Sequence, residues 1–181
     1  MPNLKPFRQY DDHDVINLFS YEGASATKGT FVKIVSGWQS QDVLEGLHGE
    51  PGAFYGNTVS TRYKTSATIT PCTSTGDKTI GMLLYTVAET DENGEKLIFN
   101  PRKAAEMQIS LSGQAVPIAT RGLFLYSGIS GDPVVGNPVY IANDGGLTCT
   151  GNRVVGQFLG LKETDGYTLI HLDINSTATL V

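Results

Sequence analysis

The sequence predicts an all-β protein, on the evidence of its composition, its turn residues and its alternating side chains. Hydrophobic residues make up 40% of the 181 residues and charged residues 17%, a balance typical of a folded chain. The 21 glycines and 8 prolines separate short segments rich in Val, Ile, Thr and Tyr. This mixture is typical of many short strands joined by tight turns. The length suits a single domain.

The first third is predicted to hold an arm, one strand and a long loop. Residues 1–12 contain two prolines and follow neither a helical nor a strand period, so they are predicted to form an extended N-terminal arm. Residues 13–20 (HDVINLFS) suit either one helical turn or a strand. Residues 29–38 (GTFVKIVSGW) alternate as a strand does. Residues 39–57 contain four glycines and are predicted to form a long loop.

Further apolar runs predict strands over 58–70, ending at Pro71, and over 79–90 and 95–99. Asn93-Gly94 supplies the positive φ angles of the hairpin turn between the last two. Asn100 as N-cap and Pro101 at the first helical position predict a short helix.

The last third is predicted to be β structure followed by a polar tail after Asn175. Residues 114–128 suit a strand pair or one bent strand, and three strands follow at 137–142, 152–161 and 167–174. Residues 13–181 therefore form a single β domain in this prediction. Its expected core residues are Ile80, Leu83, Val155, Phe158, Ile170 and Leu172.

Two pairs of segments resemble each other within the chain. Residues 28–34 (KGTFVKI) are similar to 135–141 (VGNPVYI), and residues 79–94 are similar to 154–166 in their Gly, apolar run, Glu-Thr-Asp and Gly turn. The similarity predicts two related β units with a long loop inserted in the first. Chance, or the shared residue preferences of hairpins, is the alternative.

Charge and cysteine content narrow the classes of function. The net charge of −5 argues against binding to nucleic acid, which normally requires a basic stripe. No apolar run is long enough for a membrane span, and the polar start lacks the apolar core of a secretory signal, so we expect synthesis in the cytoplasm. The distant Cys72 and Cys149 favour two free thiols, with one disulfide as the alternative.

One loop resembles a catalytic motif. Residues 128–134 (GISGDPV) are similar to the nucleophile loop of chymotrypsin-like serine proteases, with Ser130 in the attacking position. His48 and Asp77 precede it in that family's order, but both lie in turn-like stretches. We therefore expect no enzyme activity, and a serine protease is the alternative.

Two acidic segments contain side chains of the kind that bind metals. Residues 11–14 (DDHD) are interpreted as a solvated acidic turn, and residues 91–95 (DENGE) lack the terminal Glu of a calcium loop. No metal site and no cofactor are therefore expected.

Residues 121–174 resemble the capsid cement (head decoration) proteins of tailed bacteriophages. The similarity is carried by GLFLY, by Gly136-Asn137-Pro138-Val139-Tyr140, and by the segments DGGLTCTGN, VVGQFLG and TLIHLDI. It implies a small β-barrel or β-tulip domain on the outside of an icosahedral head, bound to the major capsid protein and assembled as a homotrimer. The expected location is the virion. Another virion β protein, such as a head fibre base or tail component, is an alternative.

The N-terminal arm combines apolar and basic side chains. Leu4, Phe7 and Tyr10 recur at intervals of three, and Lys5 and Arg8 lie between them. An isolated arm of this length buries too little surface to order itself. We therefore predict that Leu4, Phe7, Arg8 and Tyr10 contact a neighbouring subunit or the capsid, with a disordered terminus as the alternative.

Overall fold

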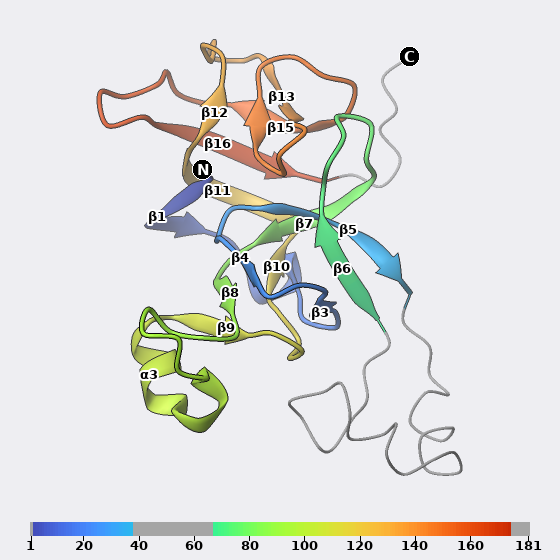
Figure 1. The fold of residues 1–181 in the computed structure, drawn as a ribbon. Coiled ribbons are helices and arrows are strands. Elements are labelled where there is room, and N and C mark those ends of the chain that lie inside the picture. The colour runs from blue at the N-terminus through green and yellow to red at the C-terminus, as the bar shows by residue number, and fades with distance from the viewer. Residues whose placement is uncertain (1, 38–66, 175–181) are drawn as a thin grey trace.

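A computed structural model describes residues 2–37 and 67–174, with the backbone alone at 6–9 (Figure 1). The predicted 39–57 loop, most of the predicted 58–70 strand and the tail after Asn175 lie outside the described residues. The described part consists of strands β1–β16 with one short α-helix and two 3₁₀ turns. The all-β prediction is confirmed.

Most of the strands belong to two units of the same topology. The first unit comprises β2 (Val15–Ile16), β3 (Ser20–Tyr21), β5 (Phe31–Ser36), β6 (Thr68–Pro71), β7 (Thr79–Leu83) and β10 (Ile118–Ala119). The second comprises β11 (Arg121–Ser127), β12 (Ile129–Ser130), β13 (Pro138–Ile141), β14 (Leu147–Thr148), β15 (Val154–Phe158) and β16 (Tyr167–Asp173). Figure 1 shows the second unit stacked on the first.

The strand order is the same in both units. The first sheet runs β2-β10-β7-β5-β6-β3, and the second runs β11-β16-β15-β13-β14-β12 with β1 (Asn3–Gln9) added beside β11. In each unit the last pair, β3 with β6 or β12 with β14, is parallel and the other pairs are antiparallel. Strands β2, β3, β5, β6, β7 and β10 of the first unit are therefore equivalent, in that order, to β11, β12, β13, β14, β15 and β16 of the second unit.

The register of the strands repeats as well. Val32 lies opposite Gly81 on β7, and Val139 lies opposite Gly156 on β15, with an irregularity directly after each valine. The turn before each strand also uses the same hydrogen bond, from Gly29 N to Leu83 O at 2.7 Å and from Gly136 N to Phe158 O at 2.8 Å. The prediction of two related β units is confirmed.

A close strand approach explains the glycine of the repeated motif. A Cβ atom at Gly81 would lie 2.4 Å from Ile118 Cγ2, and one at Gly156 would lie 2.0 Å from the carbonyl oxygen of His171. Neither distance allows a side chain. The shared Gly therefore lets the neighbouring strand, β10 or β16, lie close to β7 or β15.

Each unit has an inner face, which lines its own core, and an outer face opposite to it. Seven inner-face positions of the first unit have an equivalent position in the second unit. The equivalent residues are Ile16 and Phe124, Tyr21 and Ile129, Val32 and Val139, Ile69 and Leu147, Ile80 and Val155, Leu83 and Phe158, and Ile118 and Ile170. The first member of each pair belongs to or borders one apolar cluster, and the second belongs to another. The six predicted core residues are buried as expected, although Ile80 only partly.

The two units stack in the same orientation rather than face to face. Phe31, Met82 and Ala119, which lie on the outer face of the first unit, are fully buried in the core of the second unit. Leu84 joins them, and Val15 borders the same cluster. The outer face of the first unit therefore covers the core of the second unit.

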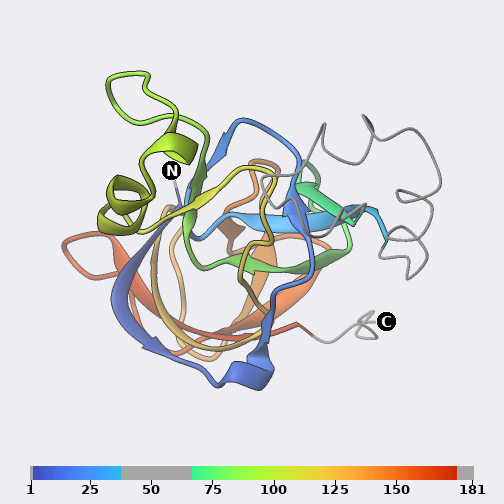
Figure 2. The same cartoon turned by 90° about the horizontal axis from the view of Figure 1, so that it is seen from below.

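An insertion between β7 and β10 enlarges the first unit. It contains β8 (Thr86–Ala88), α3 (Pro101–Glu106) and β9 (Ile109–Leu111). Strand β8 pairs with β9 and also with β4 (Ser25–Ala26), which precedes β5, and these three strands form a third sheet. Figure 2 shows this insertion projecting from one side of the molecule. Val87 on β8 and Val116 cover the inner face of the first unit.

Two local predictions in this insertion need correction. The predicted 79–90 strand divides into β7 and β8, and the predicted strand 95–99 is a 3₁₀ turn at Leu97–Phe99. The hairpin turn forms, but Asp91 accepts hydrogen bonds from the backbone N–H groups of Asn93 and Glu95, each at 2.8 Å, and pairs with Lys103. These bonds direct the chain into the helix, whose predicted Asn100 cap and Pro101 are confirmed.

The open alternatives at two other segments are resolved. Residues 13–20 contain both features, because a 3₁₀ turn at Asp12–Asp14 leads into β2. Residues 114–128 contain two successive strands, β10 and β11, which belong to different sheets and do not pair with each other.

The N-terminal segment is extended as predicted, but it is a strand of the second sheet instead of an arm separate from the β domain. Asn3–Gln9 form β1, which pairs antiparallel with β11, and Leu4 lies opposite Tyr126. Leu4 is 2% exposed within the second unit's core. The prediction treated the arm as isolated, but pairing to β11 satisfies its backbone and gives Leu4 a core to enter.

Replacing Phe158 with Ala should lower the free energy of unfolding by about 3–5 kcal/mol, because a fully buried ring is lost from the second core. Urea denaturation measures the change. Leu161→Ala serves as the control, since Leu161 is 66% exposed and should change stability by less than about 0.5 kcal/mol. A loss below about 1 kcal/mol for Phe158→Ala would contradict the described packing.

Candidate functional site

The outer face of the second unit is an open sheet surface in the described structure. Because Phe124, Tyr126, Ile170 and Leu172 point into the core, the alternate residues of β11 and β16 point outward. Leu123 lies opposite His171, and Leu125 lies opposite Leu169. The outer face comprises Leu123, Leu125, Gln157, Leu159, Leu169 and His171. Three half-buried leucines therefore lie at its centre.

The equivalent outer face of the first unit is covered, as a comparison of two equivalent leucines shows. Leu84 and Leu159 are equivalent, since Leu84 N donates to Pro117 O at 3.1 Å and Leu159 N donates to Leu169 O at 2.9 Å. Leu84 is 2% exposed because the second unit covers it, whereas Leu159 is 41% exposed. Within the described residues, the outer face is thus covered in the first unit and open in the second unit.

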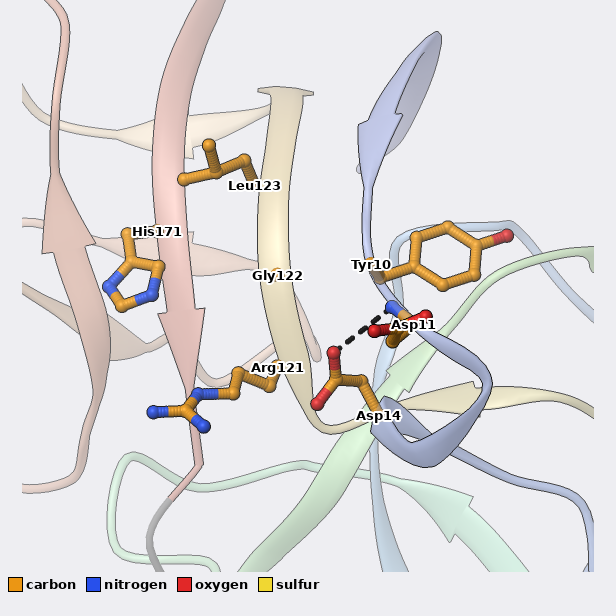
Figure 3. A pocket seen from close by; sticks show the side chains of 7 residues that line it. All are labelled: Tyr10, Asp11, Asp14, Arg121, Gly122, Leu123 and His171. Atoms are coloured by element: carbon orange, nitrogen blue, oxygen red, sulfur yellow. Dashed lines mark hydrogen bonds between the residues drawn. The ribbon is translucent and has the colours of Figure 1, made fainter.

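A groove runs along one end of the outer face (Figure 3). It has a volume of about 510 Å³, and its lining comprises Tyr10, Asp11, Asp14, Arg121, Gly122, Leu123 and His171. Figure 3 shows Asp11 and Asp14 on one side of β11, and Arg121 and His171 on the other side, toward β16. One side of the groove, here called the acidic bank, therefore carries Asp11 and Asp14. The opposite bank carries Arg121 and His171.

The acidic bank is held by a helix-capping arrangement. Asp14 Oδ2 accepts a hydrogen bond from Asp11 N at 3.0 Å, across the 3₁₀ turn between β1 and β2. A capping pair of this kind satisfies N–H groups at the start of the turn. Asp11 is exposed and Asp14 is half-buried, so carboxylate oxygens remain accessible from the groove.

Ion pairs border the apolar centre. Lys5 pairs with Asp165 and lies 4.3 Å from the centroid of the Tyr167 ring, and its hydrogen bond holds the pKa of Asp165 below the ordinary value. Arg121 Nε lies 3.8 Å from Asp173 Oδ1 on the neighbouring strand. An apolar centre with a charged rim is the usual anatomy of a protein–protein interface.

The four arm residues that were predicted to contact a partner have different surroundings in the structure. Leu4 is buried in this chain's own core, so it is not accessible to another subunit, contrary to the prediction. Tyr10 lines the groove, and its ring stacks on Phe124 with centroids 5.9 Å apart. The side chains of Phe7 and Arg8 lie outside the described part of the structure, so their contact with a partner stays a prediction.

The residues of the protease motif have other local partners. Asp77 Oδ2 accepts hydrogen bonds from Lys33 at 2.9 Å, from Thr73 N at 2.8 Å and from Ser74 N at 3.0 Å. The Lys33 contact, with the backbone bonds, lowers the pKa of Asp77. This carboxylate stabilises a turn, whereas the protease motif requires one that orients a histidine.

Ser130 is exposed on β12 and lies opposite Thr148 of β14. The described residues that line the depression around it are Thr75, Ala142, Asn143, Asp144, Thr148 and Thr150, none of which is a histidine. His48 lies outside the described residues. Within the described part, Ser130 therefore has no imidazole beside it to act as a general base.

The described residues lack the features of a metal site and of a membrane-spanning helix. No group of three or more His, Cys, Asp or Glu side chains within 2–37 and 67–174 is arranged to hold a metal ion. In those ranges, no helix has the length and apolar character to cross a membrane.

Cys72 and Cys149 are both free thiols, as the sequence favoured. Burial raises the pKa of Cys72 to about 11, and it also raises the pKa of Cys149. A raised pKa lowers the thiolate fraction at neutral pH and thereby the reactivity of the thiol.

The sequence prediction missed the outer face, although a signal for it was present. The stretches LFLY at 123–126 and LIHL at 169–172 place large side chains at every position instead of at alternate ones. Such continuous runs are typical of strands that are covered on both faces. The arrangement suits binding, since it offers apolar area and complementary charges.

Ser130 is expected to resist a serine-directed fluorophosphonate probe, because no imidazole in the described structure lies beside its hydroxyl. Mass spectrometry of the full chain after incubation would detect the adduct, and Ser130→Ala is the matched control. Stoichiometric labelling that disappears in Ser130→Ala would instead support the protease alternative.

The two thiols should react in sequence with a disulfide reagent at pH 8. Cys149 is half-buried and should react slowly, and Cys72 should react only on unfolding, because it is fully buried with a pKa of about 11. Release of thionitrobenzoate measures both rates, with Cys149→Ser isolating Cys72. Rapid reaction of native Cys149→Ser would contradict the burial of Cys72.

Comparisons with protein-family models, curated protein sequences and solved structures found no significant match to this chain. The features of the described structure that bear on function are the repeated unit, the open outer face and the groove, which carries Asp11 and Asp14 on one side and Arg121 on the other.

Proposed function

We propose that this protein is a structural virion protein that binds the outer surface of an icosahedral phage head. In this proposal it acts as a cement protein, which clamps neighbouring major capsid subunits and assembles as a homotrimer. It uses no cofactor and carries out no catalysis. A serine protease, a head fibre base and a tail component are the alternatives.

One observation supports the proposal most strongly. Residues 121–174, which carry the resemblance to cement proteins, coincide with the complete second unit, from β11 at Arg121 to the end of β16 at Asp173. The same unit bears the open outer face. The segment with the family-like motifs is thus a folded module with a surface suited to protein contacts.

The stacked units also suit a mechanical role. The outer face of the first unit is buried in the core of the second, so the two units resist separation. A rigid protein loses little conformational freedom when it binds, and more of its contact energy remains as affinity. A subunit that spans a capsid boundary can then transmit load across it.

The stabilising effect follows from linkage. A protein that binds the assembled shell but not its free subunits lowers the free energy of the shell. Each independent site contributes about 2.7 kcal/mol when the free concentration is about one hundred times Kd. Because a head has many equivalent sites, modest binding at each site can produce substantial stabilisation of the whole shell.

Purified protein should co-sediment with undecorated heads of the phage that encodes it, and it should raise the temperature at which those heads disassemble. Heads of an unrelated phage serve as the control. Cryo-electron microscopy should show regular added density on the outer surface at capsid subunit boundaries. Density confined to the tail or to fibres would favour the alternative virion roles, and absence from the particle would contradict the proposal.

A further inference from the structure

We propose that the outer face of the second unit is the surface on which a second copy of this chain docks. The inference deepens the proposed function and rests on it for the assembly of several copies. It assigns that assembly to one surface, namely the half-buried leucines Leu123, Leu125 and Leu169 together with the groove beside them.

The internal repeat shows what covers the equivalent face of the first unit. The outer-face residues of the first unit are Val15, Phe31, Met82, Leu84 and Ala119, and all of them contact the core of the second unit. Their equivalents in the second unit are Leu123, Pro138, Gln157, Leu159 and His171. This side of the β unit is therefore a surface that a β unit of this same chain already covers.

The differences between the equivalent residues indicate a contact between separate chains. Phe31 and Met82 are apolar and fully buried, whereas Pro138 is half-buried and Gln157 is exposed. A face that is covered within one chain can be wholly apolar. A face that must also remain soluble in the free chain retains polar groups around an apolar centre, as the second unit does.

The charges of the groove identify a second copy as the occupant. The face carries acidic Asp11 and Asp14 on one bank and Arg121 on the other. In a closed ring in which the same face of every copy lies toward the symmetry axis, one edge of that face meets the opposite edge of the face on the next copy. The acidic bank of one copy then lies against Arg121 of the next, which makes the face complementary to itself.

Exposed aliphatic side chains lie near the end of β15 that is farther from the groove. Leu159 and Leu161 are 41% and 66% exposed, and Val134 and Val135 are 54% and 53% exposed. The turn at Val134 lies beside β15, because Gly136 N donates to Phe158 O. The end of the face away from the groove therefore has exposed leucine and valine side chains near it, in addition to the Lys5–Asp165 ion pair.

Sedimentation velocity of the full chain over a range of concentrations tests this surface. Leu125→Glu places a charge at the centre of the face, outside the core, and should weaken self-association at least tenfold with little change in thermal unfolding. Phe99→Glu is the matched control, since Phe99 is 83% exposed on the insertion, and it should leave the association unchanged.

A charge exchange tests the opposed banks. Arg121→Glu and Asp11→Lys should each weaken self-association, because each places like charges opposite one another. The double variant should regain most of the lost affinity, since the two exchanged side chains again carry opposite charges across the interface. Asp11→Lys keeps the bond from the Asp11 backbone N–H to the Asp14 carboxylate, but it removes the Asp11 side chain from the capping pair. Asp11→Asn, which keeps a capping side chain without the charge, is therefore the control for a loss of the turn. A double variant no stronger than the single variants would overturn the pairing of these banks.

The outcomes separate this inference from the proposed function. An assembly that is unaffected by Leu125→Glu would overturn the inference while leaving the cement role intact. Self-association through this face without any binding to heads would support the inference and contradict the cement role. A wild-type chain that is monomeric at all concentrations, and whose binding to heads is lost in Leu125→Glu, would assign the face to the capsid and overturn the inference.

Discussion

The burial of the first unit's outer face in the core of the second is the contact on which the structure depends. Phe31, Met82 and Ala119 are fully buried there, beside Phe124 and Phe158 of the second unit. A sheet with one apolar face needs a second layer to cover it. In this chain the second layer is a repeat of the first, so a single contact completes the larger core and orders the two units relative to each other.

The stacking also explains why the two units differ outside their shared strands. The inner face of the first unit has no further unit to cover it within the described residues, and the insertion that carries β8 supplies Val87 for that purpose. The outer face of the second unit has neither a unit nor an insertion over it in the same part of the chain. The polar rim formed by Lys5, Asp165, Arg121 and Asp173 surrounds its leucines instead.

This asymmetry gives the protein one side suited to other chains. Strand β1 completes that side, since it extends the second sheet beyond β11 and ends at the groove. The N-terminal segment therefore contributes to the binding surface in a way different from the sequence prediction. It brings Tyr10, Asp11 and Asp14 to the groove, while Leu4 anchors it within its own chain.

The sequence by itself determined the class of fold, the turns and the repeat. Those features are local: alternation marks strands, Asn93-Gly94 marks a turn, and Gly81 and Gly156 recur in matching apolar runs. The tertiary structure decided which face of each unit is covered, because identical strand patterns can stack in either orientation. It likewise decided that Leu4 is a core residue and that residues 97–99 form a 3₁₀ turn. It also decided that the outer-face residues Leu123, Leu125 and Leu169 are not covered by another unit. These outcomes depend on contacts between residues far apart in the chain, such as Leu4 with Tyr126 and Asp91 with Lys103, which no local pattern specifies.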